Sequence, residues 1–428
     1  MRRYIQPQLE EWSEILARPA MDLQQLEAPV SEILQEVAHR GDDALLDFTA
    51  KFDGVRLADL AVSKEEIALS GEQISSELRT AIQTAKQNIE QFHRAQQDVT
   101  PTVETMPGVR CWRRSVGIER VGLYVPGGTA PLFSTVLMLA VPAVLAGCRE
   151  VVLCTPPQKD GSVHPAILYA AQLAGVEQIF RVGGAQAIAA MAYGTDSIPA
   201  TYKIFGPGNA YVTVAKQLIS KIGVAIDMPA GPSEVMVIAD ESAQPTFVAA
   251  DLLSQAEHGA DSQVVLVCYS EQMAEAVQKA TEEQLAQLPR RDFAAASLAN
   301  SATIVVNDQR EATALINAYG PEHLILAVDQ PEAWVEGIIN AGSVFMGHYT
   351  PESVGDYASG TNHTLPTNGF ARAYSGVSLD SFVRKITFQQ LTPQGLQNIG
   401  PTVETMAAAE SLDAHKLAVS IRLASLKS

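Results

Sequence analysis

The sequence predicts an α/β protein with two parallel β-sheets and with helical segments at both ends of the chain. From about residue 116 onward, short apolar runs alternate with helix-length segments, which is typical of βαβ units. The first hundred residues read as helical instead, and the chain turns helical again from residue 382. At 428 residues the chain is long enough for two or three domains.

The apolar runs predict strands in two series, each sufficient for one sheet. The first series is 120–125, 150–154, 178–182, 202–205 and 224–226, and the second is 234–239, 263–268, 303–306, 324–328 and 343–346. Helices are expected between them, for example over 130–147 and 165–175. In the helical N-terminal part, Ser63 and Glu66 form a capping-box pattern. His39 and His93 are predicted to be solvent-exposed helix residues.

Composition and charge narrow the class of protein. Hydrophobic residues make up 47% of the chain and charged residues 18%, which is a globular balance. Acidic residues outnumber basic ones by 48 to 30, so the net charge is −18. Nucleic-acid and membrane surfaces need basic patches, and neither kind of partner is expected here. The apolar segment 130–147 is interrupted by Pro142 and is too short for a membrane span.

The N-terminus lacks the apolar stretch of a signal peptide, and the cysteines show no CxxC spacing. The four cysteines are Cys111, Cys148, Cys154 and Cys268. They lie in or beside apolar runs, which predicts buried, reduced thiols in a cytoplasmic protein.

Glycine-containing turns follow three strands of the first series, at 126–128, 183–186 and 206–209. Such turns lie at the carboxyl edge of a parallel sheet, where glycine lets the backbone approach a phosphate. None of them has the GxGxxG spacing of a dinucleotide fingerprint. Each alone is also typical of a simple tight turn. Both sheets are therefore predicted to be Rossmann-like without that fingerprint.

A possible metal site begins with Gln255 and His258, which are spaced i, i+3 on a helix predicted over 247–258. An isolated pair of this kind is more typical of a polar surface. Further candidates are Asp356 and His363, in a glycine-spaced loop over 355–363, and His415 on a helical stretch after Glu410. One glutamine, one aspartate and two of these three histidines form a nitrogen and oxygen ligand set without thiolates. Such a set suits zinc and tolerates cobalt or manganese.

Glu322 and His323 follow Gly320-Pro321 and precede an apolar run. An imidazole that titrates near neutrality is suited to removing the hydroxyl proton during alcohol oxidation. The neighbouring carboxylate could activate a water molecule. The alternative interpretation is a polar start of a strand.

Six segments together resemble histidinol dehydrogenases. They are 124–128, 205–209, 226–234, 253–258, 319–324 and 355–363, and the resemblance extends from about residue 30 to the C-terminus. It implies the NAD-linked oxidation of L-histidinol to L-histidinal and then to L-histidine. It also implies one zinc ion per subunit, bound by Gln255, His258, Asp356 and His415.

The resemblance assigns roles to the catalytic and binding residues as well. His323 would be the general base, and Glu322 would activate the water that hydrates the aldehyde. The four zinc ligands and His323 would also contact substrate, as would Ser233, His363 and Glu410. Tyr124, Gln186 and Asn209 would contact NAD. His348 lies where family members vary and is not expected to bind the metal.

The resemblance further implies a homodimer that shares each active site between subunits. The implied parts are an N-terminal arm (1–23), a first α/β domain with a helical N-terminal part (24–123 and 234–380), an inserted nucleotide-binding α/β domain (124–233) and a C-terminal helical segment exchanged in the dimer (381–428). Three alternatives stay open. These are a related zinc-dependent NAD dehydrogenase for another amino or sulfonated alcohol, a catalytically silent binding protein, and a metal-dependent hydrolase.

Overall fold

The computed structural model describes residues 1–19, 23–97, 100–127, 130–229 and 231–427, and the chain divides into two compact units. The first unit comprises Met1–Gln96 and Ile118–Phe382, and the second comprises Gln97–Gly117 and Val383–Ser428. Gly128 and Ala230, which belong to the motifs above, lie outside the described residues. The predicted limits of the inserted domain, 124–233, remain a prediction.

The first unit contains a five-stranded parallel sheet in the order β6-β5-β4-β7-β8. Its strands are β4 (Arg120–Tyr124), β5 (Glu150–Thr155), β6 (Gln178–Arg181), β7 (Lys203–Phe205) and β8 (Ala225–Ile226). All five strands of the first predicted series are confirmed. Successive side chains point to opposite faces, so Leu123 and Leu153 join one buried cluster while Tyr124 and Cys154 join the other.

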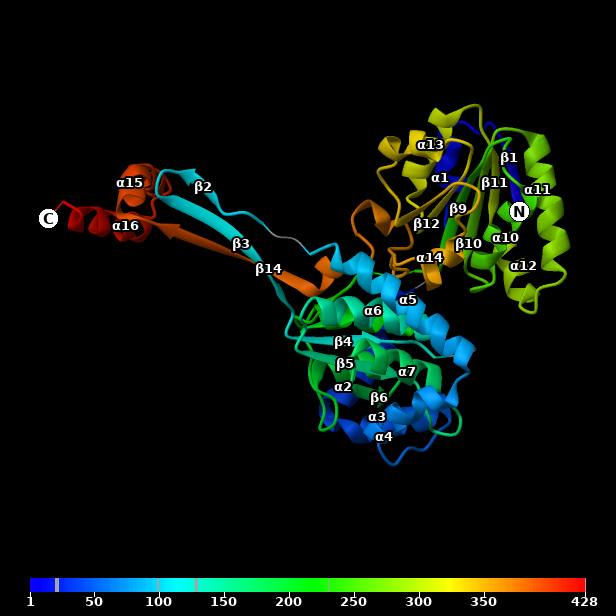
Figure 1. Cartoon of the computed structure of the whole chain (residues 1–428), viewed down its shortest axis with the longest axis horizontal. Helices are drawn as coiled ribbons and strands as arrows, with labels where there is room; N and C mark the ends of the chain where they lie inside the picture. Colours follow the sequence, from blue (N-terminus) through cyan, green and yellow to red (C-terminus); the bar gives the residue numbers. More distant parts are fainter. Residues whose placement is uncertain (20–22, 98–99, 128–129, 230, 428) are drawn as a thin grey trace. The chain divides into compact units, whose positions relative to one another are not determined.

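Helices cover both faces of this sheet, as expected for βαβ units (Figure 1). The helices in the cluster with Leu123 are α5 (Ser76–Arg94), α6 (Phe133–Leu145) and α7 (Pro165–Ala174). The helices in the cluster with Tyr124 are α2 (Gln24–Arg40), α3 (Asp42–Phe48), α8 (Gly184–Tyr193) and α9 (Ala210–Ser220). The sheet is therefore buried on both faces, and ligands reach it only at its edges.

The N-terminal part is mainly helical, as predicted, with α4 (Lys64–Leu69), η3 (Ser70–Gln73) and the π-helical turn η2 (Thr49–Asp53). The capping box is confirmed, because Ser63 Oγ accepts from Glu66 N and Ser63 N donates to the Glu66 carboxylate. The prediction for His93 is wrong, because this side chain is fully buried. Its Nδ1 lies 2.8 Å from the carbonyl oxygen of Ile89, and Nε2 lies 3.4 Å from Asn362 Nδ2.

A second, six-stranded parallel sheet has the order β1-β11-β10-β9-β12-β13. Its strands are β1 (Arg2–Ile5), β9 (Glu234–Ala239), β10 (Gln263–Cys268), β11 (Ala302–Val305), β12 (His323–Ala327) and β13 (Ser343–Met346). The second predicted series is confirmed. The expectation of a purely helical N-terminus is wrong, because β1 pairs in parallel with β11. This strand is only four residues long and leaves little periodicity in the sequence.

Both faces of the six-stranded sheet are buried as well. Its helices and helical turns are η1 (Leu9–Glu11), α1 (Trp12–Ile15), α10 (Pro245–Ala256), α11 (Glu271–Leu285), α12 (Arg291–Ala299), α13 (Gln309–Tyr319), η4 (Pro331–Gly337), α14 (Glu352–Tyr357) and η5 (Phe370–Arg372). The turn η6 (Leu379–Phe382) packs instead beside the five-stranded sheet, since Phe382 belongs to the cluster with Leu123. α10, α11 and α12 contribute to one buried cluster, and α1 and α13 to the other.

Asp251, on α10, carries a pH-dependent stability penalty. Burial raises the pKa of its carboxyl from 3.8 to about 7. A pKa raised by folding means that the penalty is absent below the unfolded value and grows as the pH rises toward the folded value. We expect Asp251→Asn to stabilise the protein by about 1 to 2 kcal/mol at pH 8, after allowance for solvent screening, and far less at pH 4. Denaturation curves at both pH values measure this difference.

The matched control is Asp292→Asn, because the side chain of Asp292 on α12 is 95% exposed. It should shift neither curve. An equal gain for Asp251→Asn at both pH values would contradict the burial argument.

The second unit is built on a three-stranded antiparallel sheet in the order β14-β3-β2. Its elements are β2 (Val103–Met106), β3 (Val109–Gly117), β14 (Val383–Leu391), α15 (Pro393–Ala409) and α16 (Asp413–Ser425). The helical prediction from residue 382 onward is wrong over β14. Phe388 of this strand stacks on its cross-strand partner Trp112, with ring centroids 5.5 Å apart. That partner is remote in sequence, so the pairing leaves no local signal.

All four cysteines are free thiols. Cys154 and Cys268 are buried as predicted, whereas Cys111 and Cys148 are half-buried. Among the helices that the structure describes, none combines the length and the apolar character that a membrane crossing requires.

Candidate active site

Glu322 and His323 lie at the amino end of β12, inside the six-stranded sheet. Both side chains are buried, and Glu322 Oε2 lies 3.5 Å from His323 Nδ1. The register pairs His323 with Val235 of β9 and with Ser343 of β13, so the pair lies at the edge where these parallel strands begin. Open α/β sheets more commonly bind ligands at the opposite, carboxyl edge.

Three of the predicted metal ligands lie close to this pair or to one another. Gln255 Nε2 is 3.1 Å from His323 Nδ1, and Asp356 Oδ1 is 3.7 Å from His323 Nε2. His258, Glu352 and Asp356 each offer a ligand atom, and these atoms lie within 4.8 Å of one another. The structure thus brings Gln255, His258 and Asp356 together from the end of α10 and from α14.

The local structure at two of these residues differs from the prediction. His258 lies in the turn after α10, which ends at Ala256, and its side chain is exposed. Asp356 lies on the short helix α14 and not in a loop. The imidazole of His258 nevertheless lies close to the carboxylates of α14. The turn itself is closed by a hydrogen bond of 3.1 Å from the N–H of His258 to the carbonyl of Gln255.

Glu352 is a site residue that the sequence analysis missed. It is buried, and its Oε1 accepts a hydrogen bond from Gln255 Nε2. Glu352 and Asp356 are spaced i, i+4 and therefore share one face of α14. A helix prediction over these residues would have revealed the pair, whereas a loop prediction hid it.

The arrangement fits a bound cation. Gln255 Oε1 and Glu352 Oε2 are buried and have no hydrogen-bond partner among the described residues. A buried oxygen left in this state costs about 1 to 3 kcal/mol. Because Glu352 holds the amide nitrogen of Gln255, the amide oxygen is left free as a ligand atom. Imidazole nitrogen with carboxylate and amide oxygen is a donor set that zinc accepts.

Electrostatics around His323 favour a positive charge. Burial lowers the pKa of His323, but the carboxylates of Glu322 and Glu352 outweigh burial and raise it well above the usual value. Burial raises the pKa of Glu352 to about 8 against the opposing effect of His323. Burial also acts to raise the pKa of Asp356, but its interaction with the nearby imidazole of His323 reverses the shift and lowers it. A cation among these carboxylates would offset their charge and bring the imidazole toward the neutral form that a base requires.

His363 joins the same cluster from the loop after α14. Its Nδ1 lies 2.8 Å from the carbonyl oxygen of Asp356, and its Nε2 lies 3.3 Å from Thr135 Oγ1 on α6. Ser233 immediately precedes β9, and its carbonyl accepts from Gln263 N at the edge where these strands begin. Both predicted substrate contacts therefore lie in the first unit. His363 also connects the cluster to the helix that follows the first glycine turn.

Glu410 and His415 belong to the second unit. Glu410 is the C-cap residue of α15, and His415 lies on the first turn of α16. Both side chains are exposed. The first unit by itself therefore contains three of the four predicted ligands.

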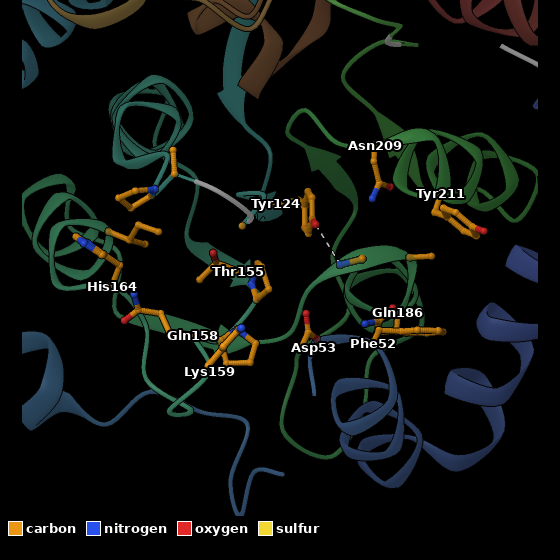
Figure 2. A pocket seen from close by; sticks show the side chains of 18 of the residues that line it. Phe52, Asp53, Tyr124, Thr155, Gln158, Lys159, His164, Gln186, Asn209 and Tyr211 are labelled. Carbon is orange, nitrogen blue, oxygen red and sulfur yellow. Dashed lines mark hydrogen bonds between the residues drawn. The ribbon is translucent and has the colours of Figure 1, made fainter. Parts of the chain in front are cut away.

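The predicted nucleotide contacts line a cavity of about 850 Å³ at the carboxyl edge of the five-stranded sheet (Figure 2). Tyr124, Gln186 and Asn209 all belong to its wall. The Tyr124 hydroxyl accepts a hydrogen bond of 3.0 Å from Gly184 N in the second glycine turn. This volume is within the range of small-molecule and cofactor sites.

Two polar side chains on the cavity wall offer unused acceptors. Asp53 Oδ2 and Thr155 Oγ1 are buried and have no hydrogen-bond partner among the described residues. Figure 2 shows both side chains below Tyr124 in this view, with Asp53 on the same side of the cavity as Gln186 and Thr155 on the same side as Gln158. Ribose hydroxyls could donate to such acceptors, so the wall fits a nucleotide. Asp53 lies in η2, in a segment without a recognisable site motif.

A buried ion pair holds the third glycine turn against the sheet. Lys216 Nζ donates to the Gly206 carbonyl at 2.9 Å and contacts Asp227, which accepts from Gly206 N at 2.8 Å. Gly206 has a φ of +129°, and a Cβ there would lie 2.0 Å from the carbonyl oxygen of Tyr124. Only glycine fits, and the turn places Asn209 at the cavity. Asp227 lies within the segment 226–234, for which the residue pattern predicts no separate role.

Comparisons with known proteins cover nearly the whole chain. The family model of histidinol dehydrogenase matches residues 16–423. Histidinol dehydrogenase of Bacteroides thetaiotaomicron is 63% identical over 421 residues, which are 98% of this chain and 98% of that protein. Its counterpart from Yersinia pestis is 54% identical over 420 residues, 97% of this chain and 94% of that protein. The crystal structure of histidinol dehydrogenase from Elizabethkingia anophelis covers 100% of this chain and 99% of its own, with a TM-score of 0.97 and 54% identity.

Proposed function

Because the chain belongs to the histidinol dehydrogenase family, we propose that it oxidises L-histidinol through L-histidinal to L-histidine and reduces two NAD. The observation that carries the proposal is the convergence of Gln255, His258 and Asp356 on the buried pair Glu322 and His323. Anchoring groups and proton-transfer groups in one place are what a two-step oxidation of a held substrate requires.

The proposed metal is one zinc ion per subunit, held by Gln255, His258 and Asp356 of one chain and by His415. Bound there, zinc would anchor the imidazole and amino nitrogens of the substrate, so that the intermediate aldehyde stays in place between the two oxidations. Glu352 supports this ligand set, because it fixes the amide of Gln255.

The proton transfers follow from the positions of His323 and Glu322. In the first oxidation, His323 takes the proton of the substrate hydroxyl group while a hydride leaves the carbon that bears this group. In the second, Glu322 takes a proton from the water that adds to the aldehyde, and the proton held by His323 passes to the aldehyde oxygen, so that the hydrate forms and His323 is a free base again. His323 then takes a hydroxyl proton of the hydrate while the second hydride leaves. NAD supplies the hydride acceptor in both oxidations.

The binding residues follow the family pattern. Ser233, His363 and Glu410 would contact substrate together with the zinc ligands and His323. Tyr124, Gln186 and Asn209 would hold NAD in the cavity of the five-stranded sheet, where their positions support that role. The free cysteines support a reducing, cytoplasmic location.

We further propose a homodimer in which each active site takes Glu410 and His415 from the partner subunit. An exposed apolar surface in the second unit supports an interface there. Met406, Leu417 and Ile421 are 60%, 58% and 56% exposed, and none of the residues of α16 is buried. Apolar side chains gathered in this way mark association surfaces.

An assay with L-histidinol, NAD and zinc-loaded protein tests the proposed function. Two NADH per histidinol consumed are expected, and no NADH would overturn the proposal. A panel of amino and sulfonated alcohols separates the related dehydrogenase. Turnover without NAD would indicate a hydrolase, and calorimetric binding without turnover would indicate a silent binding protein.

Glu322→Gln should separate the two oxidations. We expect the oxidation of L-histidinal to slow by about 10²-fold, because the glutamine side chain cannot take the proton of water. The oxidation of L-histidinol should change by less than about threefold, because His323 suffices for it. Single-turnover NADH formation from each substrate measures the two steps. Glu332→Gln, at an exposed position of η4, is the matched control. Equal losses in both steps would contradict the assigned roles.

A further inference from the structure

Glu234 touches both proposed catalytic residues with three different groups. Its N–H donates to Glu322 Oε2 at 2.9 Å, and its own Oε1 accepts from Glu322 N at 3.2 Å. Its carbonyl oxygen lies 3.2 Å from His323 Nδ1. The first residue of β9 thus fixes the carboxylate of Glu322 from the neighbouring strand and orients the ring of His323.

This arrangement places two carboxylates side by side in the core, since Glu234 is 2% and Glu322 is 6% exposed. Buried like charges repel each other unless a cation compensates. Arg18 supplies that cation through two hydrogen bonds to the Glu234 carboxylate, from Nε at 2.5 Å and from Nη2 at 2.8 Å. Such a two-pronged pair fixes orientation as well as charge.

Further contacts hold Arg18 in place. Its Nη2 also donates to the Tyr319 carbonyl at 2.9 Å, and its guanidinium carbon lies 4.0 Å from the centre of the Tyr319 ring. The Tyr319 hydroxyl donates to Gln263 Oε1 at 2.9 Å, and Gln263 Nε2 donates to the Ala17 carbonyl at 2.8 Å. The guanidinium therefore has one defined position beneath the catalytic pair.

The N-terminal segment, residues 1–19, brings Arg18 to this position. Its strand β1 pairs with β11, and Trp12, Ile15 and Leu16 are buried in the cluster beneath β9, β10 and β12. This segment contributes none of the proposed ligands or substrate contacts. Its one side chain that reaches toward the site is Arg18, among the described residues of the segment.

We propose that Glu234 and Arg18 are positioning residues for the second oxidation, with Glu234 aligning Glu322 and the N-terminal segment supplying the compensating charge. The inference rests on the proposed role of Glu322. Without Arg18, the Glu234 carboxylate repels that of Glu322 and turns away from it. Water activation then fails more than the first hydride transfer, and the aldehyde escapes before it is oxidised.

The test is Arg18→Met in the full-length, zinc-loaded enzyme. We expect kcat for L-histidinal to fall by about 10- to 100-fold, with KM for substrate and NAD and the zinc content unchanged. NADH formed per L-histidinol consumed should fall from two toward one, and semicarbazide should trap the released aldehyde. Arg18→Lys keeps the positive charge but cannot form both hydrogen bonds to the Glu234 carboxylate at once, so it should retain part of the second oxidation. It also tests the inference if Arg18→Met fails to fold.

Arg3→Met is the matched control. Arg3 lies on β1 of the same segment and pairs with Glu275, whose side chain is 68% exposed. This variant should retain two NADH per histidinol. Two NADH per histidinol in Arg18→Met and Arg18→Lys would overturn the inference. Equal losses in both oxidations together with lost zinc would also overturn it, because they indicate a merely structural role. A wild-type enzyme that forms no NADH would instead overturn the proposed function.

Discussion

His323→Ala is expected to lower kcat for both oxidations by about 10³-fold. His323 is the imidazole that lies between Gln255, Asp356 and Glu322, and each oxidation requires a hydroxyl proton to leave with the hydride. Glu322 is not expected to replace it, because its proposed role is to take the proton of the water molecule in the second oxidation only. Single-turnover rates with L-histidinol and with L-histidinal measure both losses.

Two measurements distinguish a lost base from a damaged site. Zinc content should stay at one per chain, because His323 is not among the proposed ligands. His348→Ala is the matched control, since His348 follows β13 at the opposite edge of the same sheet and lies 3.0 Å from Ser242. It should retain full activity. A His323→Ala enzyme that keeps one oxidation at its normal rate would contradict the assignment of one base to both steps.

Mixing two inactive variants should restore activity if the site is shared between subunits. Asp356→Ala removes a ligand in the first unit, and His415→Ala removes one in the second, so each homodimer should lose zinc and turnover. In a mixed dimer, one site carries both changes and the other carries neither. Random pairing makes half of the dimers mixed, and about a quarter of the wild-type activity is then expected.

Co-expression with two different affinity tags allows the mixed dimers to be isolated, and these should show about half of the wild-type activity with one zinc per dimer. Without isolation of the mixed dimers, Asp356→Ala mixed with the exposed control Asp292→Ala should show about half of the wild-type activity and not a quarter, because the control subunit is intact in both units. That mixture also has one complete site per mixed dimer, plus the fully active control homodimers. Isolated Asp356→Ala and His415→Ala mixed dimers without activity would contradict a ligand contributed by the partner.

The sequence predicts the sheets well because burial dominates their pattern. The central strands of the two parallel sheets, such as β9 and β10, are covered on both faces, and their apolar runs are therefore continuous and easy to recognise. β1 and β14 depend on partners elsewhere in the chain, namely β11 and β3. Strands of this kind carry polar side chains and are stabilised by pairing, so local periodicity does not reveal them.

The residues of the candidate site also fall into two groups, those that the sequence suggests and those that only the folded structure reveals. Gln255, His258, Asp356 and His323 stand in segments whose residue types already suggest their chemistry. Glu352, Glu234 and Arg18 do not, because a lone buried carboxylate or an arginine near the N-terminus has no distinctive sequence context. Their importance comes from neighbours that only the folded chain supplies. Supporting residues are for this reason harder to identify than ligands.

The parallel pairing of β1 with β11 affects the order in which the chain can fold. During synthesis, residues 1–19 leave the ribosome long before Ala302–Val305 exist, so the first strand must wait for its neighbour. Arg18 belongs to the same segment, and it reaches Glu234 only when β1 has paired with β11. The six-stranded sheet can therefore be completed only late in synthesis. A nascent chain cannot oxidise substrate before residues 1–19 have joined this sheet.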